Sequence, residues 1–284
     1  MKVPEGIYFH GCAWGIAFYV GVYKSLTETY GVGFGKNIKC YGNSIGCIAA
    51  LTIALGFTWQ EVEELYLTMS SSMREHSFFK LRSSDVHNEV IDYVFKKAEE
   101  MYNIDRDTII KTHLIGRYFV GVTKYYATHA WYSYHDYNSL KEALHGSFHI
   151  PIYCRKIITY ENMPILDGSY SFNPYTDLPN HGKNILKISV GENTSWCDIN
   201  PFTPLTIADC IVPGNLNKYL SIRIQGIEAA DNWKSITWIK EKNKEDYLKY
   251  SNKPCDSGSL LFFWPIRLLE NYLPVYKYSN LRVA

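Results

Sequence analysis

A serine between two glycines stands where a short apolar strand meets an apolar helix. The segment YGNSIG, residues 41–46, follows the strand-like NIKCY and precedes an apolar run that predicts a helix over residues 45–55. Gly42 and Gly46 bracket Ser44, and this spacing predicts a sharp strand-to-helix turn with the serine hydroxyl at its tip. Such a turn places a strand and a helix in immediate succession, which is typical of α/β folds.

The rest of the chain alternates between strand-like and helix-like segments. Thr58 and Glu61 have the spacing of a capping box at the start of a helix. This alternation predicts an α/β sheet with helices on both faces. Expected strands are residues 6–10, 37–41, 118–133 (a hairpin or two strands), 156–168 (two strands around a turn at Asn162, Met163 and Pro164) and 184–190; expected helices are residues 14–29, 45–55, 59–69, 83–102, 138–146 and 216–242.

Composition excludes several classes of function. The 284 residues carry a net charge of +1, so no overall positive field favours nucleic acid as a partner. The seven cysteines form no Cys-x-x-Cys pair, which favours reduced thiols in an intracellular compartment over a zinc ribbon or a disulfide scaffold. We expect no metal site, because no H-E-x-x-H or similar spacing occurs. The N-terminus does not read as a signal peptide and no apolar run reaches 18 residues, so we expect a cytoplasmic protein.

Ser44 is a candidate nucleophile because of its place in the predicted turn. A serine hydroxyl attacks only when a base takes its proton and backbone N–H groups hold the oxyanion that forms. The turn favours both, since it exposes the side chain at a helix N-terminus. The alternative is that Ser44 only caps the helix, because the G-x-S-x-G pattern often occurs by chance.

Two further segments are candidates for the rest of such a site. Asp167 ends an apolar strand and precedes Gly168, so its carboxylate is placed to act as a base. The alternative is an aspartate that serves only in a turn. The loop HGCAWG, residues 10–15, leads from the first strand into a helix, so its N–H groups are candidates for binding an anion. The alternative here is a plain connection between a strand and a helix.

In this order, the loop GCAWGIAFYVGVYKSL, the turn YGNSIG and the motif LDGS resemble the patatin-like phospholipases. The closest resemblance is to the adiponutrin and adipose triglyceride lipase group. The segments FHIPIYC before the aspartate and SWCDINP after it are also similar to that group. The resemblance extends over residues 5–205 and more weakly to residue 240, so it implies a domain at 1–240 and a C-terminal extension at 241–284.

The resemblance implies a three-layer α/β/α sandwich with a mixed, mostly parallel sheet. It also implies a serine acyl-hydrolase that cleaves carboxyl esters of phospholipid or acylglycerol without a cofactor. Ser44 would attack the ester carbonyl, and Asp167 would take its proton directly, as a Ser–Asp dyad without a histidine. The loop would hold the oxyanion. The residues assigned to the oxyanion and substrate are Gly11, Cys12, Ala13, Trp14, Gly15 and Ile45, and the motif glycines are Gly42, Gly46 and Gly168.

Four positions depart from the family pattern. Ala13 and Ile16 stand where glycines are usual, so a loop that needs backbone angles open mainly to glycine would lose a donor unless it shifts its register to Gly15. Ile45 replaces a small residue beside the nucleophile, and Ser169 replaces a glycine or alanine. The missing loop glycines motivate the alternative function, a catalytically silent domain that binds lipid or serves as a structural or interaction subunit, whereas the change at Ser169 is mild.

Three further features of the sequence have more than one interpretation. Ser44, Asp167 and His181 follow the chain order of a Ser–Asp–His triad, although His181 lies in a loop-like segment. His10 is expected either to pack or to contact substrate. The segment SLLFFWPIRLLENYL, residues 259–273, is expected to cover the domain, with peripheral contact at a membrane or lipid droplet and a dimer contact as alternatives.

Overall fold

The computed structural model describes residues 3–75, 83–124, 128–150, 158–160, 163–191, 196–206, 209–210 and 214–235. Within these ranges the chain alternates between strands and helices, as predicted. The strands are β1 (Gly6–Phe9), β2 (Lys39–Asn43), β3 (Tyr118–Lys124), β4 (Thr128–Tyr132), β5 (Ile158–Tyr160), β6 (Met163–Asp167) and β7 (Ile185–Ile188). The helices are α1 (Ile16–Tyr30), α2 (Gly46–Ala54), α3 (Trp59–Glu75), α4 (Ser83–Tyr102), α5 (Arg106–Ile109), α6 (Tyr137–Ser147) and α8 (Leu216–Ser235). Short helical turns are η1 (Ala13–Gly15), η2 (Phe34–Asn37), η4 (Ile110–Leu114), η5 (Gly168–Tyr170) and η6 (Pro179–Gly182).

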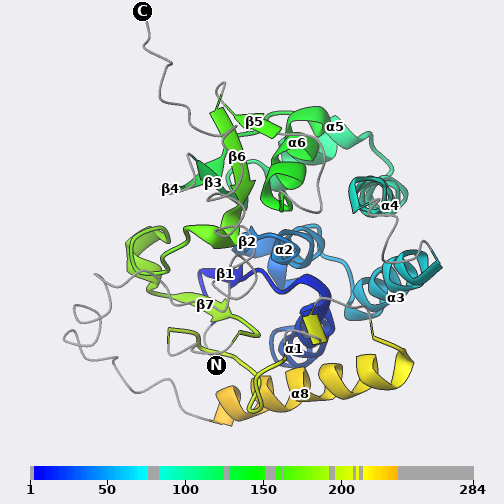
Figure 1. Cartoon of the computed structure of the whole chain (residues 1–284), viewed down its shortest axis with the longest axis vertical. Coiled ribbons are helices and arrows are strands. Elements are labelled where there is room, and N and C mark those ends of the chain that lie inside the picture. Colours follow the sequence, from blue (N-terminus) through cyan, green and yellow to red (C-terminus); the bar gives the residue numbers. More distant parts are fainter. Residues whose placement is uncertain are drawn as a thin grey trace, which may run out of the picture.

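The described strands form one mixed sheet in the order β5-β6-β3-β2-β1-β7, with β4 also paired to β3 (Figure 1). The neighbouring strands β3, β2, β1 and β7 run parallel to one another. β4 and β6 run antiparallel to β3, and β5 runs antiparallel to β6. Most of the strands therefore point in the same direction, and β4 and β6 point the other way.

β2 and β6 share one edge of β3. β4 pairs along the C-terminal part of β3 and so occupies the opposite edge there. β2 ends with Asn43 opposite Gly121, and β6 ends with Asp167 opposite Val122, the next residue of β3. Because β2 runs parallel to β3 and β6 antiparallel, their C-terminal ends meet at consecutive positions of β3. This register brings the residue after Asn43, which is Ser44, next to Asp167.

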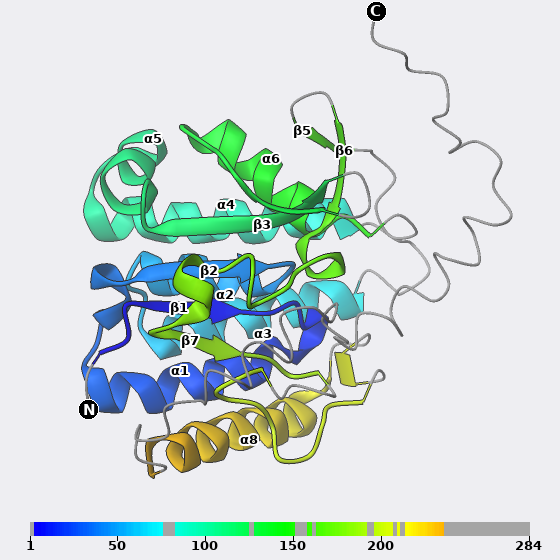
Figure 2. The ribbon, with the colours of Figure 1, turned by 90° about the vertical axis from the view of Figure 1, so that its left-hand side faces the viewer.

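One face of the sheet is covered by helices. Strand residues such as Ile7 and Phe9 pack into a core with apolar residues of α1, α2, α4 and α6. These helices lie on the same side of the strands, and α8 packs on the outside of α1 (Figures 1 and 2). α2 is buried along its whole length, which explains why apolar residues occupy all of its faces.

The opposite face carries a second, mainly aromatic cluster. Tyr8 and Tyr41 alternate with the core residues of β1 and β2, as expected for a strand buried on both faces. Phe172 stacks on the Tyr8 ring at a centroid distance of 4.3 Å, and Trp196 packs beside both. The segment between β6 and β7, which includes η5 and η6, therefore covers this face. The architecture confirms the α/β class with a mixed, mostly parallel sheet and is compatible with a three-layer α/β/α sandwich.

Local predictions are confirmed in most places. Glu61 N donates to Thr58 Oγ1 at 3.3 Å and Thr58 N donates to Glu61 Oε2 at 2.7 Å, which is the predicted capping box. The predicted turn at residues 162–164 is wrong in part, because Met163 and Pro164 pair with Tyr160 and Thr159 as the first residues of β6. The predicted extension at 241–284, with its segment 259–273, lies outside the described residues.

Candidate active site

Ser44 occupies a strained position between β2 and α2. Its φ of 53° lies in the left-handed region, which costs a residue with a side chain about 1–2 kcal/mol. The Ser147 hydroxyl accepts a hydrogen bond from Ser44 N at 2.8 Å and donates one to Gly121 O at 2.7 Å. Ser147 thereby ties the strained backbone to β3. Because β2 ends at Asn43 and α2 begins at Gly46, the predicted strand-to-helix turn is present. The Ser44 side chain lies at this turn and is half-buried.

The two glycines that bracket Ser44 allow close backbone contacts. A Cβ on Gly46 would lie 2.5 Å from Phe9 O and 2.6 Å from His10 O, a distance that packed atoms do not tolerate. A Cβ on Gly42 would lie 2.6 Å from the Cα of Cys47. The start of α2 therefore packs directly on the end of β1, and this contact brings the loop after β1 beside Ser44.

Asp167 supplies a carboxylate at the tip of the turn. Its Oδ1 accepts a hydrogen bond from Ser169 N at 2.8 Å, and the Ser44 hydroxyl is near enough to lower its pKa. The residue is only 2% exposed. Burial raises the pKa of Asp167 to about 6, and the nearby Ser44 hydroxyl, together with the amide and hydroxyl of Ser169, opposes this rise. A carboxylate with such a pKa is ionised at neutral pH and is well matched to accept a proton.

The loop after β1 leaves backbone donors beside Ser44. Within the described part of the chain, the amides of Gly11, Cys12 and Ala13 make no hydrogen bond. A Cβ on Gly11 would lie 3.0 Å from the Cβ of Ser44, so this glycine lies against the candidate nucleophile. Gly15 is different, because its amide donates to Cys12 O at 2.8 Å. The expectation that the loop shifts its register so that Gly15 supplies the missing donor is therefore wrong.

The structure shows how the loop accommodates Ala13 and Ile16, two of the residues that depart from the family pattern. Ala13 adopts φ 44°, so it keeps the left-handed conformation that glycine would favour, at a cost in strain. Ile16 begins α1 with φ −55°, an ordinary helical value that needs no glycine. Trp14 packs edge-on against Tyr66, and Ile45 is half-buried at the start of α2. The loop therefore does not require glycine at residue 16.

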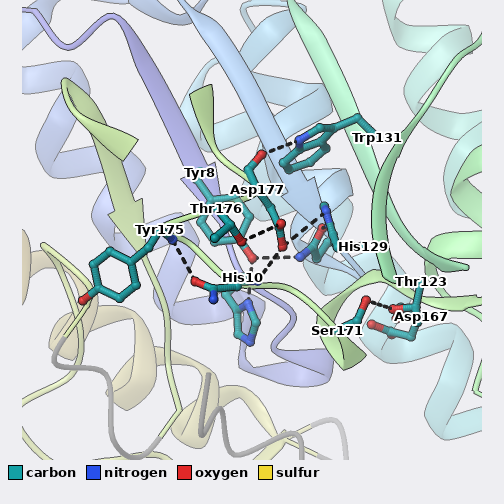
Figure 3. Close-up of polar contacts among 12 residues, drawn as sticks. Tyr8, His10, Thr123, His129, Trp131, Asp167, Ser171, Tyr175, Thr176 and Asp177 are labelled. Carbon is teal, nitrogen blue, oxygen red and sulfur yellow. Dashed lines mark hydrogen bonds and ion pairs between the residues drawn. The ribbon is translucent and has the colours of Figure 1, made fainter. Parts of the chain in front are cut away.

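A buried chain of hydrogen bonds joins the loop to the turn (Figure 3). Asn43 Nδ2 donates to the Tyr8 hydroxyl at 2.9 Å, and that hydroxyl is hydrogen-bonded to His10 Nδ1 at 2.7 Å. His129 Nε2 donates to Asn43 Oδ1 at 3.2 Å. His10 is the first residue of the loop and Asn43 precedes Ser44, so these hydrogen bonds link the two parts of the site.

Asp177 lies beside His129 at one end of this chain, outside hydrogen-bond distance. His129 Nδ1 lies 3.8 Å from Asp177 Oδ2, and Trp131 Nε1 donates to Asp177 O at 2.8 Å. Burial lowers the pKa of His10 to about 4. Burial, with a smaller effect of His10, lowers the pKa of His129 to about 3. Both imidazoles are therefore neutral at pH 7.

The other candidate base, His181, lies elsewhere. It is exposed on η6, and its Nδ1 donates to Tyr175 O at 2.8 Å. Ser44 instead lies beside Asp167, whose pKa its hydroxyl lowers. The acidic group next to Ser44 is therefore a carboxylate, and His181 lies apart from it.

No family model and no curated protein sequence matches this chain. Among the residues that the structure describes, no group of three His, Cys, Asp or Glu side chains is placed to hold a metal ion. None of the described helices is both long enough and apolar enough to cross a membrane.

Three of the site's supporting residues are not found by the sequence analysis. Asn43 lies within the turn motif YGNSIG, but nothing in that motif indicates that its side chain bonds to Tyr8 and His129. Ser147 and His129 come from α6 and β4, and they reach the site only because these elements pack on the turn. A general search for polar residues in otherwise apolar segments would have selected all three.

Proposed function

We propose that this protein is a serine acyl-hydrolase that uses Ser44 as nucleophile and Asp167 as base. The observation that carries the proposal is the position of Ser44 beside a buried carboxylate whose pKa is raised to about 6 and is affected by the Ser44 hydroxyl. Free amides in the adjacent loop and the strained turn at Ser44 add support. Buried acids of this kind are enriched at catalytic sites.

In the first half of the proposed reaction, the Ser44 oxygen forms a bond to the carbonyl carbon of a carboxyl ester. Asp167 accepts the hydroxyl proton, and the carbonyl oxygen becomes an oxyanion beside Gly11, Cys12 and Ala13. Collapse of this intermediate breaks the bond to the alcohol oxygen. Protonated Asp167 returns its proton to the departing alcohol, which leaves an acyl group on Ser44.

In the second half, water attacks the acyl group. Asp167 accepts one proton of this water, and a second oxyanion forms at the same place. Its collapse breaks the bond to the Ser44 oxygen, which takes the proton back from Asp167. The products are a carboxylic acid and the unchanged enzyme, so one carboxylate serves as base and acid in both halves.

The proposed substrates are carboxyl esters of lipids, either phospholipid or acylglycerol. This class rests on the resemblance of the three sequence motifs, and the half-buried Trp14 and Ile45 beside the loop and the turn suit an acyl chain. An enzyme that acts on aggregated lipid also needs contact with an interface, so peripheral association with a membrane or lipid droplet is part of the proposal.

A fluorophosphonate probe and a short-chain p-nitrophenyl ester test the proposal with the purified full-length protein. We expect labelling and turnover by the wild type, and loss of both in Ser44→Ala. Ser171→Ala is the matched control, because its hydroxyl pairs with Thr123 Oγ1 at 2.9 Å on the same segment as Asp167. Asp167→Asn should lose turnover as well.

The opposite result would favour the alternative of a catalytically silent domain. Equal, background-level rates for the wild type and Ser44→Ala, together with absent labelling, would contradict the proposed hydrolase. A flotation assay with phosphatidylcholine vesicles would then examine whether the protein binds lipid without cleaving it.

A further inference from the structure

Ser169 places a buried hydroxyl at the dyad that the reaction described so far does not use. The residue is 6% exposed, and its amide already donates to Asp167 Oδ1. Within the described structure its Oγ has no partner in hydrogen-bond geometry. Buried hydroxyls are normally paired, so an unpaired one beside a candidate nucleophile calls for an explanation.

The Ser169 hydroxyl borders the small space that the missing side chain of Gly11 leaves beside Ser44. A Cβ built on Gly11 would lie 2.1 Å from Ser169 Oγ and 3.0 Å from the Cβ of Ser44. The absence of a side chain at Gly11 therefore leaves room that the Ser169 hydroxyl borders on one side and the nucleophile on the other. The amide donors of the loop begin at the same residue.

We propose that the Ser169 hydroxyl is a catalytic hydrogen-bond donor to the oxyanion that forms on the acyl carbon attached to Ser44. The inference rests on the proposed hydrolase function and adds a side-chain donor to the loop amides. No covalent bond to Ser169 forms or breaks. Its proton stays on Oγ throughout, and only the direction of the O–H bond changes.

Charge movement during the reaction explains why the hydroxyl is unpaired at rest. Before attack, the negative charge is on Asp167, and the Ser169 hydroxyl is near enough to lower the pKa of that carboxyl without a well-formed hydrogen bond. When Asp167 accepts the Ser44 proton, the charge moves to the oxyanion. A serine hydroxyl rotates freely, so its hydrogen can follow the charge to the new position. A donor that pairs only in the transition state raises kcat rather than lowering KM.

Steady-state kinetics of Ser169→Ala and Ser169→Gly test the inference, with Ser171→Ala as control. Loss of one oxyanion donor is expected to lower kcat by about a hundredfold while KM changes little. The rate of fluorophosphonate labelling should fall in parallel, because the adduct carries the same oxygen. Both variants should fold, since alanine or glycine removes a polar group that has no partner, and thermal unfolding checks this directly.

The kinetics at alkaline pH separate this role from an effect on Asp167. If Ser169 only tunes the carboxylate, the variants will regain wild-type kcat once Asp167 is fully ionised, and that result overturns the inference. A hundredfold deficit that persists on the plateau supports it. Failure of the hydrolase itself is recognised separately, because Ser44→Ala would then equal the wild type.

Discussion

The hydroxyl of Ser147 accepts a 2.8 Å hydrogen bond from the backbone amide of Ser44. It comes from the last residue of α6, whereas Ser44 follows β2, so the contact joins two elements far apart in the chain. Ser44 holds φ 53°, and a backbone in this region persists only where its surroundings over-determine it. Ser147 is one such restraint on the candidate nucleophile.

Ser147→Ala should lower both stability and activity. The change leaves the Ser44 amide without its acceptor and removes a hydrogen bond to Gly121 O, which costs about 1–3 kcal/mol in the free energy of unfolding. Urea unfolding and ester hydrolysis measure the two effects. Thr112→Ala, at an exposed helical site, should change stability by less than about 0.5 kcal/mol. A Ser147 variant as stable and active as this control would contradict the restraint.

The activity should rise with pH through the pKa of Asp167. That pKa is raised to about 6 by burial, and only the ionised carboxylate accepts the Ser44 proton. We therefore expect kcat/KM to be half-maximal near pH 6, to fall about tenfold per pH unit below it, and to level off above pH 7. A stopped assay across pH 4.5–8.5 measures the profile, and a flat profile would refute the assignment of Asp167 as the base.

Asp167→Asn should stabilise the fold at neutral pH while it removes activity. The carboxyl titrates near its ordinary value of 3.8 in the unfolded chain and at about 6 in the folded protein. The folded state thus binds more protons between these values, and wild-type stability falls as pH rises through them. At a cost of about 1.4 kcal/mol per pKa unit, asparagine should gain up to about 3 kcal/mol above pH 6. Urea unfolding should show this gain vanish near pH 4; a gain independent of pH would be inconsistent.

Ala13→Gly should make the protein more stable. Alanine at φ 44° pays a cost of about 1–2 kcal/mol that glycine does not pay, and the greater freedom of glycine in the unfolded chain offsets about half of it. The expected gain is about 0.5–1 kcal/mol by urea unfolding. Ala17→Gly, inside α1, should instead destabilise by about 1 kcal/mol. Destabilisation by both changes would show that Ala13 is not strained.

Acid should weaken the fold in part through His129. Its pKa is lowered by burial to about 3 in the folded protein, against an ordinary value of 6.5. The unfolded chain therefore binds the extra proton below pH 6.5, and stability falls as pH falls, by about 1.4 kcal/mol per unit. The stability difference between wild type and His129→Gln should shrink by about 2 kcal/mol between pH 7 and pH 5. A constant difference would mean that His129 does not titrate as the neutral buried group described.

Much of the local structure could be read from the order of residues along the chain. The period of apolar residues predicts the helix at 83–102. Thr58 and Glu61 mark the start of α3, the helix that precedes it in the chain. The glycines around Ser44 located the turn, because only a residue without a side chain fits such close backbone contacts. These features depend on near neighbours, whose influence on backbone geometry is strong enough to be seen in short segments.

The order of residues along the chain therefore predicts the α/β alternation, the turn at Ser44 and the strand that ends at Asp167. The meeting of β2 and β6 on one edge of β3, which brings the Ser44 hydroxyl beside the Asp167 carboxylate, depends on the assembled sheet. Tertiary structure also decided that Ala13 takes a glycine-like conformation and that Asn43 connects His10 to His129 through Tyr8. Contacts between distant segments, and the burial that raises the pKa of Asp167, exist only once the whole sheet has assembled, because each depends on groups that the chain brings together from separate elements.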